Sequence, residues 1–230
     1  MDINLKDKII AFIPARGGSE GCKDKNIKLF NGKPLIYYSI EFARKCGLGD
    51  STYVSTDDLK IEEIASGYGV KVIKRPDELA TAKSTVSEAA LHFLENIGDT
   101  ATDAEYLLVL QPTNPLRTLA HFEDALRLII ERDADCVFTV TPLKVKLGEL
   151  VNGFFKPTFF EFHQQRQDLN NYLSMNGLIF LSKISSLLKY RSIFGEKSVP
   201  IIVGEMYTLA DIDTPLDFEV TEFLYKKFNS

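Results

Sequence analysis

Short apolar runs alternate with longer stretches of helical periodicity through the first 140 residues, and this alternation constrains the fold more than any other feature. The runs predict buried strands at residues 9–13, 51–55, 70–73, 106–110 and 136–140. Between them lie predicted helices, one of which follows a Thr85-x-x-Glu88 capping box. Buried strands that alternate with helices predict an α/β fold of three layers, in which helices cover both faces of a mainly parallel sheet.

The pattern breaks down between residues 142 and 176. This segment holds an aromatic pair at Phe154-Phe155 and the polar run HQQRQDLNN, which begins at His163. A long irregular segment inside a compact domain usually has a function, so we expect a lid or a protruding arm here. Beyond it, apolar runs predict further strands at residues 178–181 and 199–203.

The end of the chain carries a strong signal for a helix. Thr214 is a predicted N-cap, and Pro215 follows as the first helical residue. We expect this helix to turn its apolar residues toward the core: Leu216, Val220, Phe223 and Leu224. A chain of 230 residues has the length of one large domain, so we interpret residues 1–230 as a single domain with residues 142–176 inserted as an arm.

The composition argues against several classes of protein. The 27 basic and 32 acidic residues give a formal net charge of −5, which offers no basic excess for a nucleic-acid backbone. The longest apolar runs have about five residues, whereas a membrane-spanning helix needs about 20. Cys22, Cys46 and Cys136 are odd in number and form no Cys-x-x-Cys motif, which favours a reducing compartment. We therefore expect a cytoplasmic protein.

A glycine-rich, basic loop follows the first predicted strand, with the sequence RGGSEG from Arg16 and then Lys23 and Lys25. In a sheet of Rossmann-like topology, a loop at the carboxyl end of such a strand is where a nucleotide is expected. Glycine N–H groups and cationic side chains both suit phosphate oxygens. The loop matches neither G-x-x-x-x-G-K-[ST] nor G-x-G-x-x-G, so a flexible surface loop is the alternative on these residues alone.

A series of motifs extends from about residue 8 to residue 220. They are IPARGGS-x-G-x-x-x-KN-I from Ile13, GKPLI from Gly32, Val54-Ser55-Thr56-Asp57, Arg75-Pro76-x-Glu78-Leu79, LQPTNPLR from Leu110, Gln165-Arg166-Gln167, Asn176-Gly177 and Asp211-Ile212-Asp213. In this order they resemble the CMP-sialic acid synthetases, the acylneuraminate cytidylyltransferase family.

The resemblance implies a reaction with CTP. The anomeric 2-hydroxyl of a nonulosonic (sialic-acid-like) sugar would attack the α-phosphorus of CTP, so that pyrophosphate leaves and a CMP-sugar forms. The resemblance also implies a need for Mg²⁺ and a homodimer, in which the arm of one subunit completes the site of the other. Neither a nucleic acid nor a membrane is expected as a partner.

The resemblance also assigns the nucleotide site. It gives Arg16 and Lys25 to the triphosphate, where fixed positive charge would stabilise the transition state. Ser19 and Asn26 match positions that contact the nucleotide. The predicted catalytic residues are Arg16, Lys25, Arg166 and Asp213.

Four further residues are assigned to the two substrates. Arg75 matches an arginine at the cytidine end and Ser84 a nucleotide-contacting serine, although on the residues alone Arg75 could cap a turn and Ser84 the next helix. Gln111 offers an amide that suits sugar hydroxyls and an N-acyl group. Arg166, in the arm, matches an active-site arginine, and its guanidinium fits a substrate carboxylate. Without the resemblance, Arg166 would be interpreted as solvated surface.

Asp211 and Asp213 form the candidate metal site. In an extended segment, residues two apart point to the same side, so both carboxylates can share one hard cation. By resemblance this pair holds the Mg²⁺. The alternative is acidic decoration of the N-terminus of the last helix, which its dipole favours.

The chain departs from the family pattern at a few positions. Glu20 stands where a lysine is usual, and Val86 and Asn114 each stand where a serine is common. In the arm, the run from Lys144 to Glu149 replaces a histidine-proline followed by a lysine. These departures leave the acceptor open to legionaminic, pseudaminic or Kdo-type acids.

Other classes of function stay open as alternatives. A glycosyltransferase can also hold a nucleotide sugar with an Asp-x-Asp pair, but the basic loop after the first strand and the LQPTNPLR motif argue against it. Another nucleotidyltransferase, or a nucleotide-sugar-binding module without catalysis, would carry similar loops.

Overall fold

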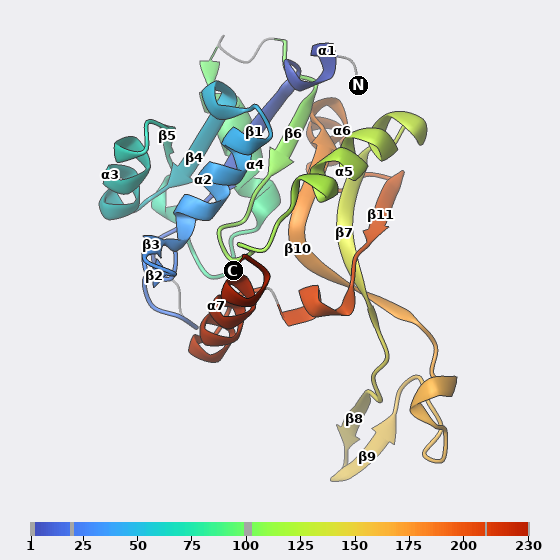
Figure 1. Cartoon of the computed structure of the whole chain (residues 1–230). Helices are drawn as coiled ribbons and strands as arrows, with labels where there is room; N and C mark the ends of the chain where they lie inside the picture. Colours follow the sequence, from blue (N-terminus) through green and yellow to red (C-terminus); the bar gives the residue numbers. More distant parts are fainter. Residues whose placement is uncertain (1–2, 19–20, 99–102, 210, 230) are drawn as a thin grey trace.

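The protein is built around one seven-stranded sheet (Figure 1). The computed structural model describes residues 3–18, 21–98, 103–209 and 211–229. The strand order is β11-β7-β10-β6-β1-β4-β5. In chain order, the strands are β1 (Ile9–Pro14), β4 (Thr52–Thr56), β5 (Lys71–Lys74), β6 (Tyr106–Val109), β7 (Cys136–Leu143), β10 (Tyr172–Lys183) and β11 (Ser198–Ile202). Each of the seven predicted strands lies on one of these, so the predicted α/β class is confirmed.

The sheet is mainly parallel, as predicted. β1 runs parallel to both β4 and β6, with Ala11 opposite Thr52 on one side and Leu108 on the other. β10 is antiparallel to β6 and to β7, whereas β11 is parallel to β7. The carboxyl ends of β1, β4 and β6 therefore meet at the same edge, where the loops that follow them can form a common site.

Helices cover both faces of the sheet and make three layers (Figure 1). On one face, Ile9, Ala11 and Ile13 of β1 pack in a core with α2 (Leu35–Lys45), α3 (Leu59–Gly67) and α5 (Leu119–Glu131). On the other, Ile10 and Phe12 pack with α4 (Val86–Asn96) and α6 (Ile184–Tyr190). Burial of each large apolar side chain stabilises the fold by roughly 1.5–3 kcal/mol. The two cores therefore hold β1 and its neighbouring strands firmly in place.

The remaining elements are short or lie at the ends of the chain. They are α1 (Ile3–Lys6), α7 (Pro215–Asn229), the hairpin β2 (Leu29–Phe30) with β3 (Lys33–Pro34), the hairpin β8 (Gly148–Val151) with β9 (Phe154–Pro157), and the 3-10 turns η1 (Gly49–Ser51), η2 (Asp77–Leu79), η4 (Arg166–Asp168) and η5 (Glu205–Leu209). None of the helices in the described ranges combines the length and the hydropathy of a membrane span.

The predicted helix starts are confirmed at α4 and α7. The N–H of Glu88 donates to Oγ1 of Thr85 at 3.1 Å, and the Glu88 carboxylate accepts from the N–H of Thr85 at 2.7 Å. Asp217 and Thr214 make the same reciprocal pair at the start of α7, at 2.7 and 3.2 Å. The alternative role of Ser84 as a helix cap is wrong, because Thr85 is the N-cap of α4.

The predicted inner face of α7 is only partly right: Leu224 packs against the core and Val220 is half-buried, but Leu216 and Phe223 do not face inward. Leu216 and Phe223 are 68% and 64% exposed, whereas Phe218 is buried. The reason is the aromatic cluster of the β2–β3 region: Phe218 packs edge-on against Phe30, with ring centres 5.5 Å apart. Tyr225, two turns along the same face, packs 5.5 Å from Phe30 as well, and Leu216 and Phe223 consequently point the other way.

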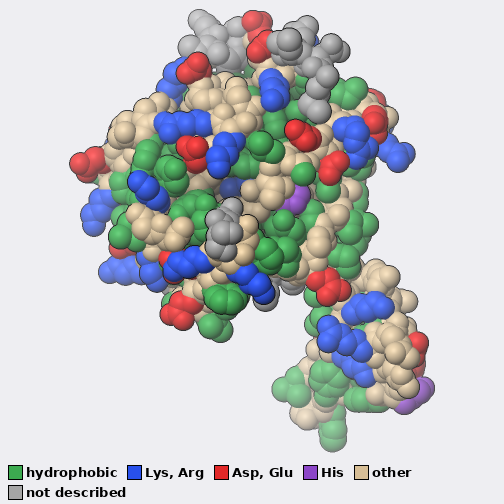
Figure 2. All heavy atoms as spheres, in the orientation of Figure 1, with side chains coloured by type: hydrophobic (Ala, Val, Ile, Leu, Met, Phe, Trp, Pro, Cys, Tyr) green, Lys and Arg blue, Asp and Glu red, His purple; other side chains and the backbone are tan. Residues whose placement is uncertain are grey.

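The irregular segment predicted at 142–176 is an arm that projects from the sheet (Figure 1). β7 and β10 continue outward as a two-stranded stalk that ends at the pair Leu143 and Tyr172, and β8, β9 and η4 lie beyond it. Large apolar side chains are exposed there: Leu150 is 80%, Phe154 78% and Phe162 69% exposed. Figure 2 shows hydrophobic side chains at the end of the arm and basic ones on the face toward the viewer.

Candidate active site

A cavity of about 140 Å³ lies at the carboxyl ends of β1 and β6. It is lined by predicted site residues from five segments of the chain: Arg16, Lys25, Asn26, Arg75, Ser84 and Gln111. Val86, one of the departures from the family pattern, lines it too. Residues predicted on separate motifs therefore meet in one place, at the edge of the sheet where the topology favours a ligand.

Larger cavities lie elsewhere, and the two that follow contain none of the predicted residues. One of about 630 Å³ is lined by Lys8, Glu105 and Arg127, at the amino ends of β1 and β6. Another of about 530 Å³ lies between α2 and α7, with Tyr38 and Tyr225 in its lining. Size alone does not mark the chemistry, and we choose the smaller cavity because cationic and amide side chains converge on it.

The loop after β1 is held by its own polar contacts. Asn26 is 5% exposed, and its Nδ2 donates to the carbonyl of Arg16 at 2.9 Å. The N–H of Gly17 donates to Oδ1 of Asp57, which follows β4, at 2.8 Å. Both contacts hold the peptide group between Arg16 and Gly17, and the Arg16 side chain lines the cavity. Ser19 and Glu20 lie outside the described residues.

Arg75 is buried under the cavity floor at 4% exposure. Its Nη2 donates to the carbonyl of Ser55 at 2.8 Å and its Nε to the Ser55 hydroxyl at 3.1 Å. Burial lowers the pKa of Arg75 to about 10, with nearby Asp57 acting in the opposite direction and Arg16 adding to the decrease. Arg75 is thus still charged at neutral pH and brings a fixed positive charge to the site.

Ser84 lies in the turn before α4. Its hydroxyl accepts from the N–H of Thr81 at 3.1 Å and donates to the carbonyl of Glu78 at 3.3 Å. The hydroxyl therefore shapes the turn as well as lining the cavity.

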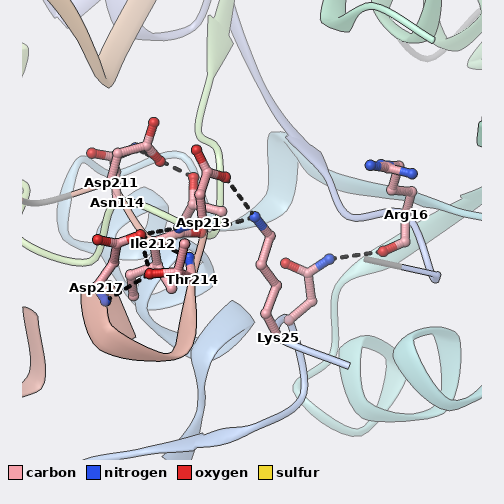
Figure 3. A network of polar contacts seen from close by, with 10 residues as sticks. Arg16, Lys25, Asn114, Asp211, Ile212, Asp213, Thr214 and Asp217 are labelled. Atoms are coloured by element: carbon pink, nitrogen blue, oxygen red, sulfur yellow. Dashed lines mark hydrogen bonds and ion pairs between the residues drawn. The ribbon is translucent and has the colours of Figure 1, made fainter. Parts of the chain in front are cut away.

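Lys25 connects the loop after β1 to the predicted metal pair (Figure 3). Its Nζ donates to the carbonyl of Ile212 at 2.8 Å and to Oδ1 of Asp213 at 3.0 Å. The Lys25 side chain is 16% exposed and that of Asp213 74% exposed. Lys25 is thus a half-buried cation whose bound carboxylate faces solvent.

Asp211 has different surroundings from Asp213. Its Oδ1 accepts from Nδ2 of Asn114 at 3.1 Å (Figure 3). The residue as a whole is exposed, yet protein atoms around the carboxyl group desolvate it and raise its pKa. The charge of Asp213 raises the pKa of Asp211 further, whereas a hydrogen bond from Thr113, the charge of Lys25 and the bond from Asn114 act to lower it.

The carboxylate oxygens of Asp211 and Asp213 fit a divalent cation whose remaining ligands come from a bound substrate. The two carboxylates are close enough to repel each other, and the ammonium of Lys25 already lies against one of them. No cluster of three or more His, Cys, Asp or Glu side chains with metal-binding geometry occurs in the described ranges. Mg²⁺ needs no such cluster, because it typically binds one or two carboxylates and completes its shell with phosphates and water.

Arg117 anchors the loop between β6 and α5. Its guanidinium donates to the carbonyls of Gln111 and Leu178 and, at 2.9 Å, to the hydroxyl of Ser39. Burial lowers its pKa to about 9, while Asp211 acts to raise it. Gly177 closes the other side of this loop with φ +69°, and a Cβ there would lie 2.7 Å from Oε1 of Gln111.

The single chain does not bring Arg166 to the other predicted residues. Arg166 begins the short turn η4 in the arm, where it is exposed, and it does not line the cavity. Asn114, one of the departures from the family pattern, is not among the predicted site residues. It is completely buried and bonded to Asp211, and the only sequence signal for it was its place in the LQPTNPLR motif.

Known proteins resemble this chain along most of its length. A family model described as cytidylyltransferase matches residues 10–219. The chain is 32% identical to the N-acylneuraminate cytidylyltransferase of Escherichia coli O18:K1:H7 over 98% of its own length, although it spans only 54% of that protein. It is 34% identical to the CMP-N,N'-diacetyllegionaminic acid synthase of Campylobacter jejuni, with 94% of each chain covered.

The solved structures agree on the fold. A CMP:2-keto-3-deoxy-manno-octonic acid synthetase complexed with CTP superimposes with a TM-score of 0.72 at 17% identity, over 96% of this chain and 99% of the other. At that identity the likeness concerns the fold alone. The family model and the relatives of matching length carry the assignment further: the chain belongs to the cytidylyltransferases, in the acylneuraminate cytidylyltransferase (CMP-sialic acid synthetase) family.

Proposed function

We propose that this protein transfers CMP from CTP to the anomeric 2-hydroxyl of a nonulosonic acid and releases pyrophosphate. The observation that carries the proposal is the single cavity that unites Arg16, Lys25 and Arg75 with the amides of Asn26 and Gln111. Phosphate oxygens need the cations, and nucleoside and sugar hydroxyls need the amides.

The triphosphate would lie along the loop after β1. Typical ligand cavities have about 300–1,000 Å³, so a cavity of about 140 Å³ holds one part of a nucleotide. The rest would extend toward Lys25 and Asp213. Charge grows on the leaving pyrophosphate as the bond to the α-phosphorus breaks, and the fixed cations Arg16 and Lys25 would stabilise that charge more than the charge of the ground state.

Asp211 and Asp213 would hold a Mg²⁺ ion beside these phosphates. The metal would supply Lewis-acid stabilisation of the charge on the phosphate oxygens. The two side chains contribute hard oxygen ligands from one segment, and Lys25 donates to Asp213 from the opposite side. When phosphates draw Lys25 away, Asp213 becomes available as a ligand.

The acceptor would lie near Gln111, and a second copy of the chain would bring Arg166 to it. Arg166 lies in η4 of the arm and does not line the cavity of its own chain. The arm exposes the apolar side chains of Leu150, Phe154 and Phe162, which a homodimer would cover. The guanidinium would then bind the carboxylate that every nonulosonic acid carries.

The cysteines support a reducing compartment such as the cytoplasm. Cys22, Cys46 and Cys136 are buried and unpaired. Desolvation raises the pKa of Cys46 and of Cys136 to about 12, so both stay as inert thiols.

Release of pyrophosphate tests the reaction. With Mg²⁺ and N-acetylneuraminic acid, we expect release from CTP and little from ATP, GTP or UTP. Equal release from all four nucleotides, or release that EDTA does not abolish, would contradict the proposal. Arg16→Ala should reduce the rate strongly, and Arg127→Ala, which changes an exposed arginine of α5 on the other cavity, is the matched control.

A further inference from the structure

Asn114 is a completely buried polar side chain beside the candidate metal pair. It lies in the loop between β6 and α5, where its N–H donates to the carbonyl of Gln111 at 3.2 Å. Its Nδ2 donates to Oδ1 of Asp211 at 3.1 Å and to Oγ1 of Thr113 at 3.3 Å. One amide group therefore links the cavity loop to a carboxylate 97 residues away in the chain.

The orientation of this amide is fixed by chemistry. A carboxylate only accepts hydrogen bonds, so the NH₂ group of Asn114 must face Asp211. The cost is that Oδ1 of Asn114 is buried with no hydrogen-bond partner within the described residues. A buried acceptor without a partner destabilises a fold, so the structural benefit of Asn114 is small and its contact with Asp211 is the feature that needs an explanation.

The same loop also holds the backbone beside Asp211. The N–H of Ile212 donates to the carbonyl of Thr113 at 3.1 Å, and the Ile212 side chain is completely buried. Asp211 is thus fixed at two points, through its side chain and through its neighbour in the chain. Asp213, in contrast, is 74% exposed, and its carboxylate is bonded only to Nζ of Lys25 among the side chains of the described residues.

The side-chain amide of Asn114 has room only because Gly177, which lies opposite it, has no side chain. A Cβ on Gly177 would lie 2.9 Å from Nδ2 of Asn114. A serine at position 114 would also hold a donor, but on a shorter side chain, so Asn114 reaches Asp211 where serine would need the segment to move closer.

We propose that Asn114 is a positioning residue that orients Asp211 as the fixed ligand of the metal, with Asp213 as the ligand that joins when the nucleotide binds. The inference rests on the proposed metal-dependent function. Groups that orient a metal ligand typically change metal affinity or activity about 10- to 100-fold when they are removed.

Binding of Mn²⁺ in the presence of CTP, with no acceptor sugar, tests the proposal. Electron paramagnetic resonance of free Mn²⁺ gives the Kd without turnover. Asn114→Leu removes the donor and the unpaired Oδ1 and keeps the branched shape and the number of heavy atoms, so we expect a Kd about tenfold higher or more, with a Tm close to that of wild type. Asn114→Ser should lie between Asn114→Leu and wild type. Thr52→Val is the matched control and should leave the Kd unchanged. It removes a buried hydrogen bond of 2.6 Å, from the Thr52 hydroxyl to the carbonyl of Leu48, at the amino end of β4.

A double-mutant cycle separates positioning from a general structural effect. In an Asp211→Asn background, Asn114→Leu should change the Kd for Mn²⁺ by less than about twofold, because its partner is already gone. A folded Asn114→Leu protein that binds Mn²⁺ like wild type would overturn the positioning role, even if pyrophosphate release is normal. If Mn²⁺ binding depends on Asn114 while no nucleotide releases pyrophosphate, the proposed reaction fails and the positioning role stands.

Discussion

Two carboxylates of the candidate metal pair differ in how tightly the protein holds them. Asp211 is bonded to a buried amide, whereas Asp213 is bonded to Lys25 and is 74% exposed. In the proposed reaction, this pair would bind a metal and Lys25 would turn to the phosphates. Because the Asp213 carboxylate is exposed, water and a cation can reach it without any change in the fold.

Asp213→Asn should abolish most of the activity and leave the fold intact. The amide keeps the shape of the side chain but removes the negative charge that a divalent cation needs. We expect the rate of pyrophosphate release at saturating Mg²⁺ to fall about 100-fold or more. The Tm should stay close to that of wild type because the side chain is exposed. Turnover near the wild-type rate would show that Asp213 is no metal ligand.

Gly21→Ala should loosen metal binding through the backbone. A Cβ at Gly21 would lie 2.3 Å from the carbonyl oxygen of Asp213, too close for any real contact, so the loop after β1 and the metal segment must separate. We expect the Mg²⁺ concentration for half-maximal rate to rise about tenfold. Gly67→Ala is the control, because nothing lies within 4 Å of its added Cβ. Identical Mg²⁺ dependence in both variants would refute this coupling.

The sequence located much of the candidate site because several of its motifs directly follow predicted strands. Arg16 follows β1 and Gln111 follows β6, and parallel topology brings such loops together. The role of Asn114 could not be predicted in this way. Its importance lies in a contact with Asp211, 97 residues away, and no local pattern encodes that contact.

At the scale of elements, β10 shows that a local sequence pattern predicts only part of a strand. The apolar run at residues 178–181 predicted only the inner part of β10, which extends over Tyr172–Lys183. The outer part of β10 alternates between exposed and half-buried residues because it pairs with β7 in the stalk and has no helix above it. An apolar run therefore predicts only the part of a strand that helices cover, and not the exposed part in the stalk.

Asp133, in the turn after α5, forms ion pairs with the end of β10 and with the segment before β11. It accepts from Lys183 of β10 at 2.5 Å and from Lys197, just before β11, at 2.8 Å. The hydrogen bonds and charges of these two lysines lower the pKa of Asp133 from 3.8 to about 2. Because this pKa lies below the usual value, the ionised carboxylate stabilises the fold above about pH 4, and the contribution is lost as the pH falls toward 2.

Asp133→Asn should therefore lower stability at neutral pH and have less effect in acid. Asn suits the left-handed backbone at this position, φ +45°, so the backbone should not be strained. Urea unfolding at pH 7, 4 and 3 measures the difference, which should shrink as the pH falls and also in 1 M NaCl, where the Debye length is about 3 Å. A difference that is constant from pH 7 to pH 3 would contradict the electrostatic origin.

At the scale of the whole molecule, the arm is the part that a single chain does not explain. It exposes apolar side chains such as Leu150 and Phe154, and it carries Arg166 away from the cavity. The sequence predicted where the arm lies, because the strand–helix alternation fails there. It could not predict the direction in which the arm projects, because that direction depends on the stalk of β7 and β10.

Mixing two inactive variants tests whether the arm serves a second copy. Arg166→Ala removes the arm's contribution and Asp213→Asn removes the metal site. If the arm of one subunit completes the site of the other, each mixed dimer has one intact site. After subunit exchange in equal amounts, we expect about a quarter of the wild-type activity. No recovery, with mixed dimers demonstrated by mass spectrometry, would show that Arg166 acts within its own chain or not at all.

Formation of a CMP-sugar is the direct test of whether this protein transfers CMP to a nonulosonic acid. The protein with CTP and Mg²⁺ would be offered N-acetylneuraminic, legionaminic, pseudaminic and Kdo acids separately, with pyrophosphate and nucleotide products measured together by mass spectrometry. We expect one CMP-sugar for each pyrophosphate, with a nine-carbon acid as the preferred acceptor. Absence of any CMP-sugar with all four acids, together with no protection of the protein by CTP against heat, would contradict the account.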